Sequence, residues 1–231
     1  MREDYHRQLD RLVEDLADLA GLVAEAMSKA TAALLRVDLT LAERVIEQDL
    51  LVDQRRAEAE ETAVRLLALH APVATDLRSV VTAIHAAADL EHMGDLALHV
   101  AKTARLRHPQ PALPDQIQPY FAEMGLLAVA IAENTGHAIR TRDVELAAEL
   151  ARDDDAMDDL HRHIFTALTA PQWSYGVSCA VNITLLARFY ERYADHAVTV
   201  ARRIVYLVTG ALPDLCPPPQ PKPPSGRGSR I

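Results

Sequence analysis

Apolar residues recur along this chain three or four positions apart, which is the spacing of amphipathic helices. No segment alternates apolar and polar residues with the period of two that a strand shows, so the pattern predicts no sheet. Prolines and turn residues divide the pattern into six segments of roughly 25–35 residues each. Short connectors make neighbouring helices antiparallel. We therefore expect an all-α fold of six long helices, arranged as two tandem three-helix bundles.

The expected helix ends carry familiar signals. Residues 40–43, Thr-Leu-Ala-Glu, have the form of a capping box and would open the second helix. Asp143 is placed to cap the N-terminus of the fifth helix. Gly210 would end the sixth helix, because glycine readily adopts the left-handed conformation found just past many helices.

These breaks divide the chain into four parts. Residues 1–108 are expected to form a first three-helix repeat, and residues 120–210 a second. Residues 109–119 hold four prolines and are predicted to be a linker. Residues 211–231 are rich in proline and are predicted to be a disordered tail.

Four pairs of acidic residues have a spacing of four positions, which puts both side chains on one face of a helix. They are Asp49/Asp53, Glu91/Asp95, Asp154/Asp158 and Glu191/Asp195. The third pair follows the first by 105 residues, and the fourth follows the second by 100. This register indicates an internal duplication with a similar acidic site in each half. Like charges at this spacing repel by roughly 0.2–0.5 kcal/mol on an isolated helix, so a bound multivalent cation is a physical candidate for what offsets the repulsion.

The acidic pairs interrupt rows of residues that have the spacing of a helix core. In the third helix the row is Leu77, Val81, Ile84, Ala88, Glu91, Asp95 and Leu98. In the sixth helix it is Val177, Val181, Thr184, Arg188, Glu191, Asp195 and Val198. Because the last two helices of each repeat would run side by side, four carboxylates should meet in each half. Such buried charges are costly unless they are paired or bound to metal. All-oxygen ligands suit hard cations, so iron, manganese, magnesium or calcium is expected, and structural zinc is not.

The composition limits the range of partners. The net charge of −9 argues against a nucleic-acid binder and against electrostatic docking to anionic lipid. No apolar run approaches the roughly 20 residues that span a bilayer, so no direct membrane insertion is expected. The two cysteines, Cys179 and Cys216, form no legible disulfide framework, which favours a reduced, cytoplasmic setting.

Two other interpretations of the acids stay open. Arg56, Arg188 and Arg192 are near enough in sequence to neutralise some of them, which would leave a structural helical module without metal. A carboxylate-bridged metal-dependent enzyme, of the phosphohydrolase or oxidase type, is the second, since two-metal sites perform such chemistry. The sequence contains no glycine-rich phosphate loop and no nucleophile arrangement, so a non-enzymatic role is favoured.

Two motifs resemble those of a known family. The run Pro-Val-Ala-Thr-Asp-Leu-Arg at 72–78, followed by Asp-Leu-Glu-His-Met-Gly-Asp at 89–95, resembles the first-repeat signature of the PhoU family. The run Ala-Arg-Phe-Tyr-Glu-Arg-Tyr-Ala-Asp-His-Ala at 187–197, with Tyr-Leu-Val-Thr-Gly at 206–210, resembles its second-repeat signature. The resemblance extends over about residues 5–210, which is most of the chain.

This resemblance implies a cytoplasmic pair of three-helix bundles whose E/D-x-x-x-D motifs bind multinuclear metal clusters, iron among them, at the surface. It also implies a negative regulator of phosphate uptake and signalling. Such a regulator links the ATPase subunit of a phosphate ABC transporter to a phosphate-sensing histidine kinase. A homodimer is expected. Grooves open on one side would reconcile surface clusters with the core-like rows.

By the same resemblance, the metal ligands would be the eight acids of the four pairs. The chain departs from the family pattern at His92, where arginine often follows the glutamate, while the second half keeps Arg192. The proline-containing run at 72–78 also has no counterpart before the sixth helix. The two sites are therefore expected to differ in affinity or metal.

Overall fold

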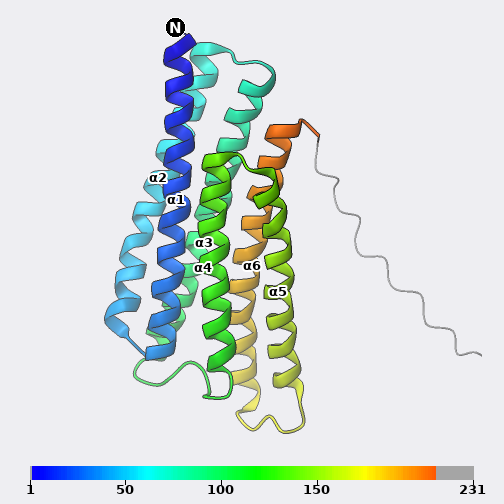
Figure 1. Ribbon diagram of the computed structural model, residues 1–231. Coiled ribbons are helices and arrows are strands. Elements are labelled where there is room, and N and C mark those ends of the chain that lie inside the picture. Colours follow the sequence, from blue (N-terminus) through cyan, green and yellow to red (C-terminus); the bar gives the residue numbers. More distant parts are fainter. Residues whose placement is uncertain (1, 212–231) are drawn as a thin grey trace, which may run out of the picture.

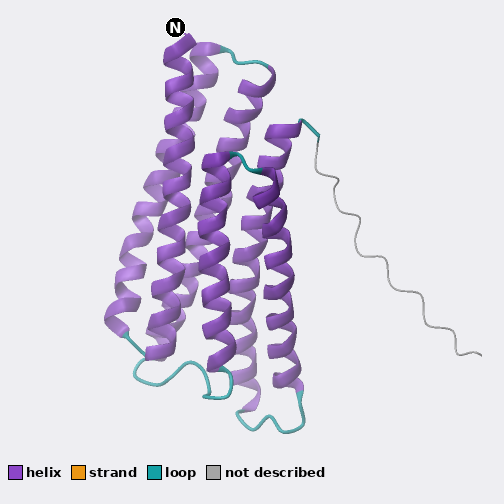
Figure 2. Ribbon diagram, viewed as in Figure 1, coloured by secondary structure: helices purple, strands orange, loops and turns teal. Residues whose placement is uncertain are grey.

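Six long helices make up the fold of the computed structural model, which describes residues 2–211. They are α1 (Arg2–Arg36), α2 (Leu39–His70), α3 (Ala74–Arg107), α4 (Gln118–Thr141), α5 (Val144–Thr169) and α6 (Gly176–Thr209). Turns and loops form the rest of the described backbone, with no strand in residues 2–211 (Figure 2). The predicted all-α fold is confirmed.

Consecutive helices run in opposite directions and form two groups of three (Figure 1). The helices within each group contact one another, and the two groups meet where α1 packs on α4 and α3 packs on α6. In the described part of the chain, α2 contacts only α1 and α3, and α5 contacts only α4 and α6. The two predicted bundles are therefore joined through α1, α3, α4 and α6, while α2 and α5 lie at the outer edges.

The two groups share one hydrophobic core, because buried residues from all six helices form a single cluster. Thr31 of α1 and Tyr190 of α6 share a hydrogen bond of 2.8 Å, and the Tyr190 ring meets Phe121 of α4 edge to face at 5.6 Å. Gly125 of α4 lets the backbone come close, since a Cβ built there would lie 2.5 Å from the Cγ2 of Thr31. The junction between the halves is thus a packed interior and not a loose contact.

The start of α2 differs from the prediction. The carboxylate of Asp38 accepts a hydrogen bond from the backbone N–H of Leu41 at 2.9 Å, so Asp38 is the N-cap. The capping box predicted at residues 40–43 is wrong, because Thr40 already lies inside the first turn of the helix. An aspartate is as good a cap as a threonine, and it lies two positions earlier.

The other two predicted helix ends are confirmed. Asp143 caps α5, accepting hydrogen bonds from the N–H groups of Glu145 and Leu146 at 2.8 Å and 3.1 Å. Gly210 follows α6 with a φ of 72°, and its N–H donates to the carbonyl of Tyr206 at 2.8 Å. A residue with a Cβ would be strained at that φ, which is why glycine ends the helix.

None of the helices in residues 2–211 combines the length and the apolarity needed to cross a membrane. The proline-rich tail was predicted to begin at residue 211, and its residues 212–231 lie outside the described residues.

Candidate metal centres

The eight predicted acids come from two helix pairs, each made of an outer helix (α2 or α5) and a helix of the junction (α3 or α6). Asp49 and Asp53 lie on α2, which packs along α3 with its Glu91 and Asp95. The second half repeats this with α5 and α6, which carry Asp154/Asp158 and Glu191/Asp195. Each of the two packed helix pairs therefore carries four of the acids, as the register of the duplication predicts. We call these groups the first and the second acidic cluster.

The first acidic cluster is held together against strong mutual repulsion. Burial raises the pKa of Asp49 to about 6, and the neighbouring carboxylates of Asp53, Asp95 and Glu91 add to the rise. The pKa of Glu91 is also raised, first by burial and then by Asp95, with a smaller contribution from Asp53. Since acids of both helices act on each other, all four carboxylates share one electrostatic environment.

The second acidic cluster shows the same coupling to a larger degree. Burial raises the pKa of Asp154 to about 7, helped by the charges of Asp195, Asp158 and Glu191. The pKa of Glu191 is raised by burial and by Asp195, while Arg188 opposes the change. The four carboxylates of α5 and α6 thus act on one another electrostatically in the second half as well.

The acids lie at the edge of the core rather than within it. Val81 and Val177, members of the predicted rows, are 37% and 80% exposed, and Asp53 and Asp195 are also exposed. The prediction that these rows face the core is therefore wrong along much of their length. On α3 the fully buried stripe runs one position earlier, through Val80, Ala83, Ala87, Leu90 and Ala97. A shift of one residue turns a helical side chain by about 100°, so the acidic rows lie at the rim of the helix interfaces.

Arginines neutralise the clusters only in part. Arg188 pairs with Glu191, and Arg56 is 2.9 Å from Glu60 while also lowering the pKa of Glu91 by its charge. Glu191 is only 9% exposed, and its Oε2 has no hydrogen-bond partner among the described residues. The buried Oδ1 of Asp154 also has no hydrogen-bond partner among the described residues. Buried carboxylate oxygens without partners are costly, and a cation would satisfy them.

The donor chemistry fits the cations predicted from the sequence. Each cluster offers carboxylate oxygens from two neighbouring helices, and such ligands suit Mg²⁺, Ca²⁺, Mn²⁺ or iron. In the first cluster a ligand atom of Glu91, one of His92 and one of Asp95 all lie within 4.8 Å of one another. In the sequence, His92 stands out only as a departure from the family pattern. It directly follows Glu91, the first acid of an i, i+4 pair, and that position is the signal in the sequence for a possible ligand role.

A second set of residues, next to the first cluster, was missed from the sequence. Asp89 of α3 accepts from Arg203 of α6 at 3.2 Å and lies 3.1 Å from the Nδ1 of His196, also on α6. The ring of His196 in turn lies 5.3 Å from that of His92. These contacts cross between the two halves of the molecule, and no helical spacing within one segment indicates them.

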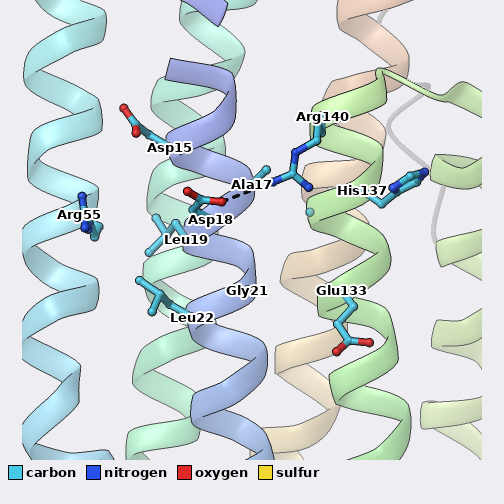
Figure 3. Close-up of a pocket in the computed structure, with 11 residues that line it drawn as sticks. Asp15, Ala17, Asp18, Leu19, Gly21, Leu22, Arg55, Glu133, His137 and Arg140 are labelled. Carbon is cyan, nitrogen blue, oxygen red and sulfur yellow. Dashed lines mark hydrogen bonds and ion pairs between the residues drawn. The ribbon is translucent and has the colours of Figure 1, made fainter. Parts of the chain in front are cut away.

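A groove elsewhere on the surface holds none of the eight acids. It lies over α1 between Arg55 of α2 and the α4 residues Glu133 and Arg140 (Figure 3). Arg140 points across to α1, where it contacts Glu14 at 2.8 Å and Asp18 at 3.4 Å. The groove is lined by charges of both signs, and Arg140 forms an ion pair with Asp18 within it, so it offers no concentrated charge of one sign.

The PhoU domain model matches residues 16–104 and 121–204, one stretch in each half. The chain therefore belongs to the PhoU family, as its two motifs predicted. It is 54% identical to the "Phosphate-specific transport system accessory protein PhoU homolog 2" of Mycobacterium tuberculosis over 213 residues, 92% of this chain and 100% of that protein. It is 52% identical to PhoU homolog 1 of Mycobacterium leprae over 93% of this chain and 96% of that protein.

Solved structures agree with the sequence comparison. The fold matches the crystal structure of the phosphate transport system regulatory protein PhoU from Streptococcus pneumoniae with a TM-score of 0.82 and 28% identity, over 91% of this chain and 100% of that one. Crystalline PhoU from Pseudomonas aeruginosa matches with a TM-score of 0.78 and 27% identity, over 90% of this chain and 100% of that one.

Proposed function

We propose that this chain is a cytoplasmic accessory protein of a phosphate-specific transport system and a negative regulator of phosphate uptake and signalling. It would link the transporter's ATPase subunit to a phosphate-sensing histidine kinase. The names of its relatives, which describe accessory and regulatory proteins of phosphate transport, support this role. The observation that carries the proposal is the pair of coupled acidic clusters, one in each half of a PhoU-family fold.

In this proposal each cluster holds metal ions. Asp49, Asp53, Glu91 and Asp95 would bind in the first half, and Asp154, Asp158, Glu191 and Asp195 in the second. The cations would neutralise carboxylates that otherwise repel one another across each helix pair. They would thereby fix α2 against α3 and α5 against α6, and so set the shape and charge of the outer surface.

The partner contacts need a surface, and the second half exposes an apolar one. Phe165 of α5 and Val177, Val181 and Leu185 of α6 line a groove near the start of α6, and all four are more than half exposed. Exposed apolar patches of this kind often mark protein–protein contacts. We assign this groove to one of the proposed partner contacts, with the homodimer as the competing occupant.

A test of the role uses cells rich in phosphate. Affinity purification of the tagged chain should recover the ATPase subunit or the sensor kinase, and deletion of its gene should raise phosphate uptake. Val181→Asp should weaken the partner contact, whereas Leu126→Asp, at a residue of α4 that is 76% exposed and outside the groove, should not. Recovery of neither partner together with unchanged uptake would refute the role.

The proposal includes the absence of catalysis. Steady-state assays with phosphate esters and added Mn²⁺ or iron should show no turnover above that of the free metal. Turnover that disappears in an acidic-cluster variant would instead establish the metal-dependent enzyme considered above. If the chain is instead a purely structural module, protein purified gently should contain no metal above background.

A further inference from the structure

We infer that His92 is a metal ligand, so that the first acidic cluster is a mixed nitrogen–oxygen site while the second binds through oxygen. The two sites of this chain would then select different cations. This inference rests on the metal binding proposed above and adds to it a ligand, a chemical class of metal and a difference between the halves.

The geometry at the first cluster places a ring nitrogen among carboxylate oxygens. The Nδ1 of His92 lies 2.9 Å from the Oε2 of Glu91, and the ligand atoms of Glu91, His92 and Asp95 are mutually within 4.8 Å. Three ligand atoms bound to one zinc-sized ion lie about 3.3–3.6 Å from one another, given bonds of about 2.0–2.2 Å. A movement of less than about 1 Å at each ligand atom would therefore let all three reach one ion. The His92 side chain is 56% exposed, which leaves it free to make that movement.

The ring of His92 contacts a residue of the other half of the molecule. The ring of His196, on α6, lies 5.3 Å from it at an angle of 56°. His196 is only 18% exposed at its side chain and is held by Asp89, which also binds Arg203. The ring of His196 is thus held beside His92 on the α6 side, while His92 itself keeps the freedom to turn toward an ion.

The second cluster lacks the same nitrogen ligand. The residue one hundred positions after His92 is Arg192, which is exposed and whose guanidinium has no lone pair to offer a metal. His161 of α5 lies near Asp158 and Arg188, close enough for their charges to act on it. Among the described residues, the only three His, Cys, Asp or Glu side chains whose ligand atoms all lie within 4.8 Å of one another are Glu91, His92 and Asp95, so the acids of the second cluster would have to move closer together to share an ion.

The chemical consequence is a difference in selectivity. Imidazole suits zinc, copper, nickel and iron, whereas carboxylate and water suit magnesium, calcium and manganese. The first cluster should therefore prefer a borderline transition metal such as Zn²⁺, and the second a hard cation such as Mn²⁺. The earlier expectation of hard cations at both sites rested on carboxylates alone, and the imidazole changes it for the first half.

The test is calorimetric titration of metal-stripped, full-length chain, purified without a polyhistidine tag, with Zn²⁺ and with Mn²⁺ separately. Glu191→Gln with Asp195→Asn should abolish metal binding at the second cluster, so that binding at the first is measured alone. In that background, His92→Gln should weaken Zn²⁺ binding by at least about tenfold and change Mn²⁺ binding by less than about twofold. His85→Gln, at an exposed residue two turns earlier on α3, is the matched control and should change neither. Circular dichroism confirms that each variant is folded.

The converse experiment introduces a histidine at the matching position of the second cluster. With Glu91→Gln and Asp95→Asn silencing the first cluster, Arg192→His should tighten Zn²⁺ binding at the second by about tenfold. If wild-type chain binds neither metal at either cluster, the proposed metal binding itself fails. If it binds metal and His92→Gln leaves Zn²⁺ affinity unchanged, the inference about His92 is overturned while the metal proposal stands.

Discussion

The two acidic clusters have carboxylates at matching positions but differ in the residues around them. In the first half, His92 touches Glu91, and Arg56 and Lys102 bring positive charge close to the acids. In the second half, Arg188 pairs with Glu191, yet buried oxygens of Glu191 and Asp154 have no hydrogen-bond partner among the described residues. The pKa of the most perturbed acid is about 6 in the first half and about 7 in the second. A duplicated backbone thus repeats the ligand positions, while the surrounding side chains decide how strongly each site needs a cation.

The largest expected effect comes from removing one acid in each half. Asp95→Ala should empty the first cluster and Asp195→Ala the second, with metal affinity at the altered site falling at least about tenfold. The double variant should lose most of its metal while keeping its helicity, because removing a repelling charge does not unfold the bundle. Elemental analysis of protein purified without chelator or polyhistidine capture measures the change. Unchanged metal content in the double variant would contradict the assignment of these residues.

A smaller effect is expected where the halves differ at the α3–α6 junction. Asp89 is 13% exposed and binds both His196 and Arg203, whereas its counterpart one hundred positions later is Phe189, which stacks on His99 at 5.2 Å. Asp89→Asn should lower the free energy of unfolding by about 1.5–3 kcal/mol, the usual cost for hydrogen bonds to a charged group. Phe189→Leu should cost less, about 0.5–1.5 kcal/mol for the aromatic pairing.

Urea denaturation of both variants checks this order. Asp4→Asn, which breaks an exposed ion pair with Arg7, is the control and should cost at most about 1 kcal/mol. An Asp89 variant no less stable than this control would show that the junction does not depend on the charged contacts.

A still smaller effect separates Gly94 of the first half from Ala194, its counterpart in the second. A Cβ at position 94 would lie 2.9 Å from the Cγ1 of Val52, so glycine lets α2 approach α3 beside the first cluster. Gly94→Ala should cost about 1 kcal/mol net, since overpacking by about 1–3 kcal/mol is offset in part by the helix propensity of alanine. Gly21→Ala has open space around it and should not destabilise the protein. Thermal unfolding compares the two, and restored stability on adding Val52→Ala would locate the clash.

The two halves also differ in how the stability of metal-free protein depends on pH. An aspartate in the unfolded chain loses its proton near pH 3.9, whereas folded Asp49 holds it to about 6 and Asp154 to about 7. Between these values the folded state binds more protons, so its stability falls as the pH rises from 5 to about 7. Asp154→Asn should flatten the upper part of this slope more than Asp49→Asn does.

Urea denaturation over this pH range, with chelator present, measures the slope. Added metal should flatten it, because a cation favours the ionised carboxylates. Stability that rises between pH 5 and 7 in the presence of chelator would contradict the raised pKa values.

The spacing of the acids predicted which of them lie on the same helix face, but not how deeply they are buried. The pairs at four-residue intervals placed their carboxylates on one helix face, and the duplication indicated that the four would meet. The rows through Val81 and Val177 suggested a core position, yet the structure turns them toward the rim. Periodicity gives the face of a helix to within about one residue, and one residue is enough to move a side chain from the core to a groove.

What the sequence by itself determined is local and periodic: six helices, two of the three examined helix ends, and eight acids in duplicate register. Only the tertiary structure decided which helices of the two halves touch, and hence that Asp89, His196 and Arg203 meet beside His92. The physical reason is that helical spacing depends on neighbours three or four residues apart. Contacts between α3 and α6 depend on how two complete bundles bury their remaining apolar faces against each other.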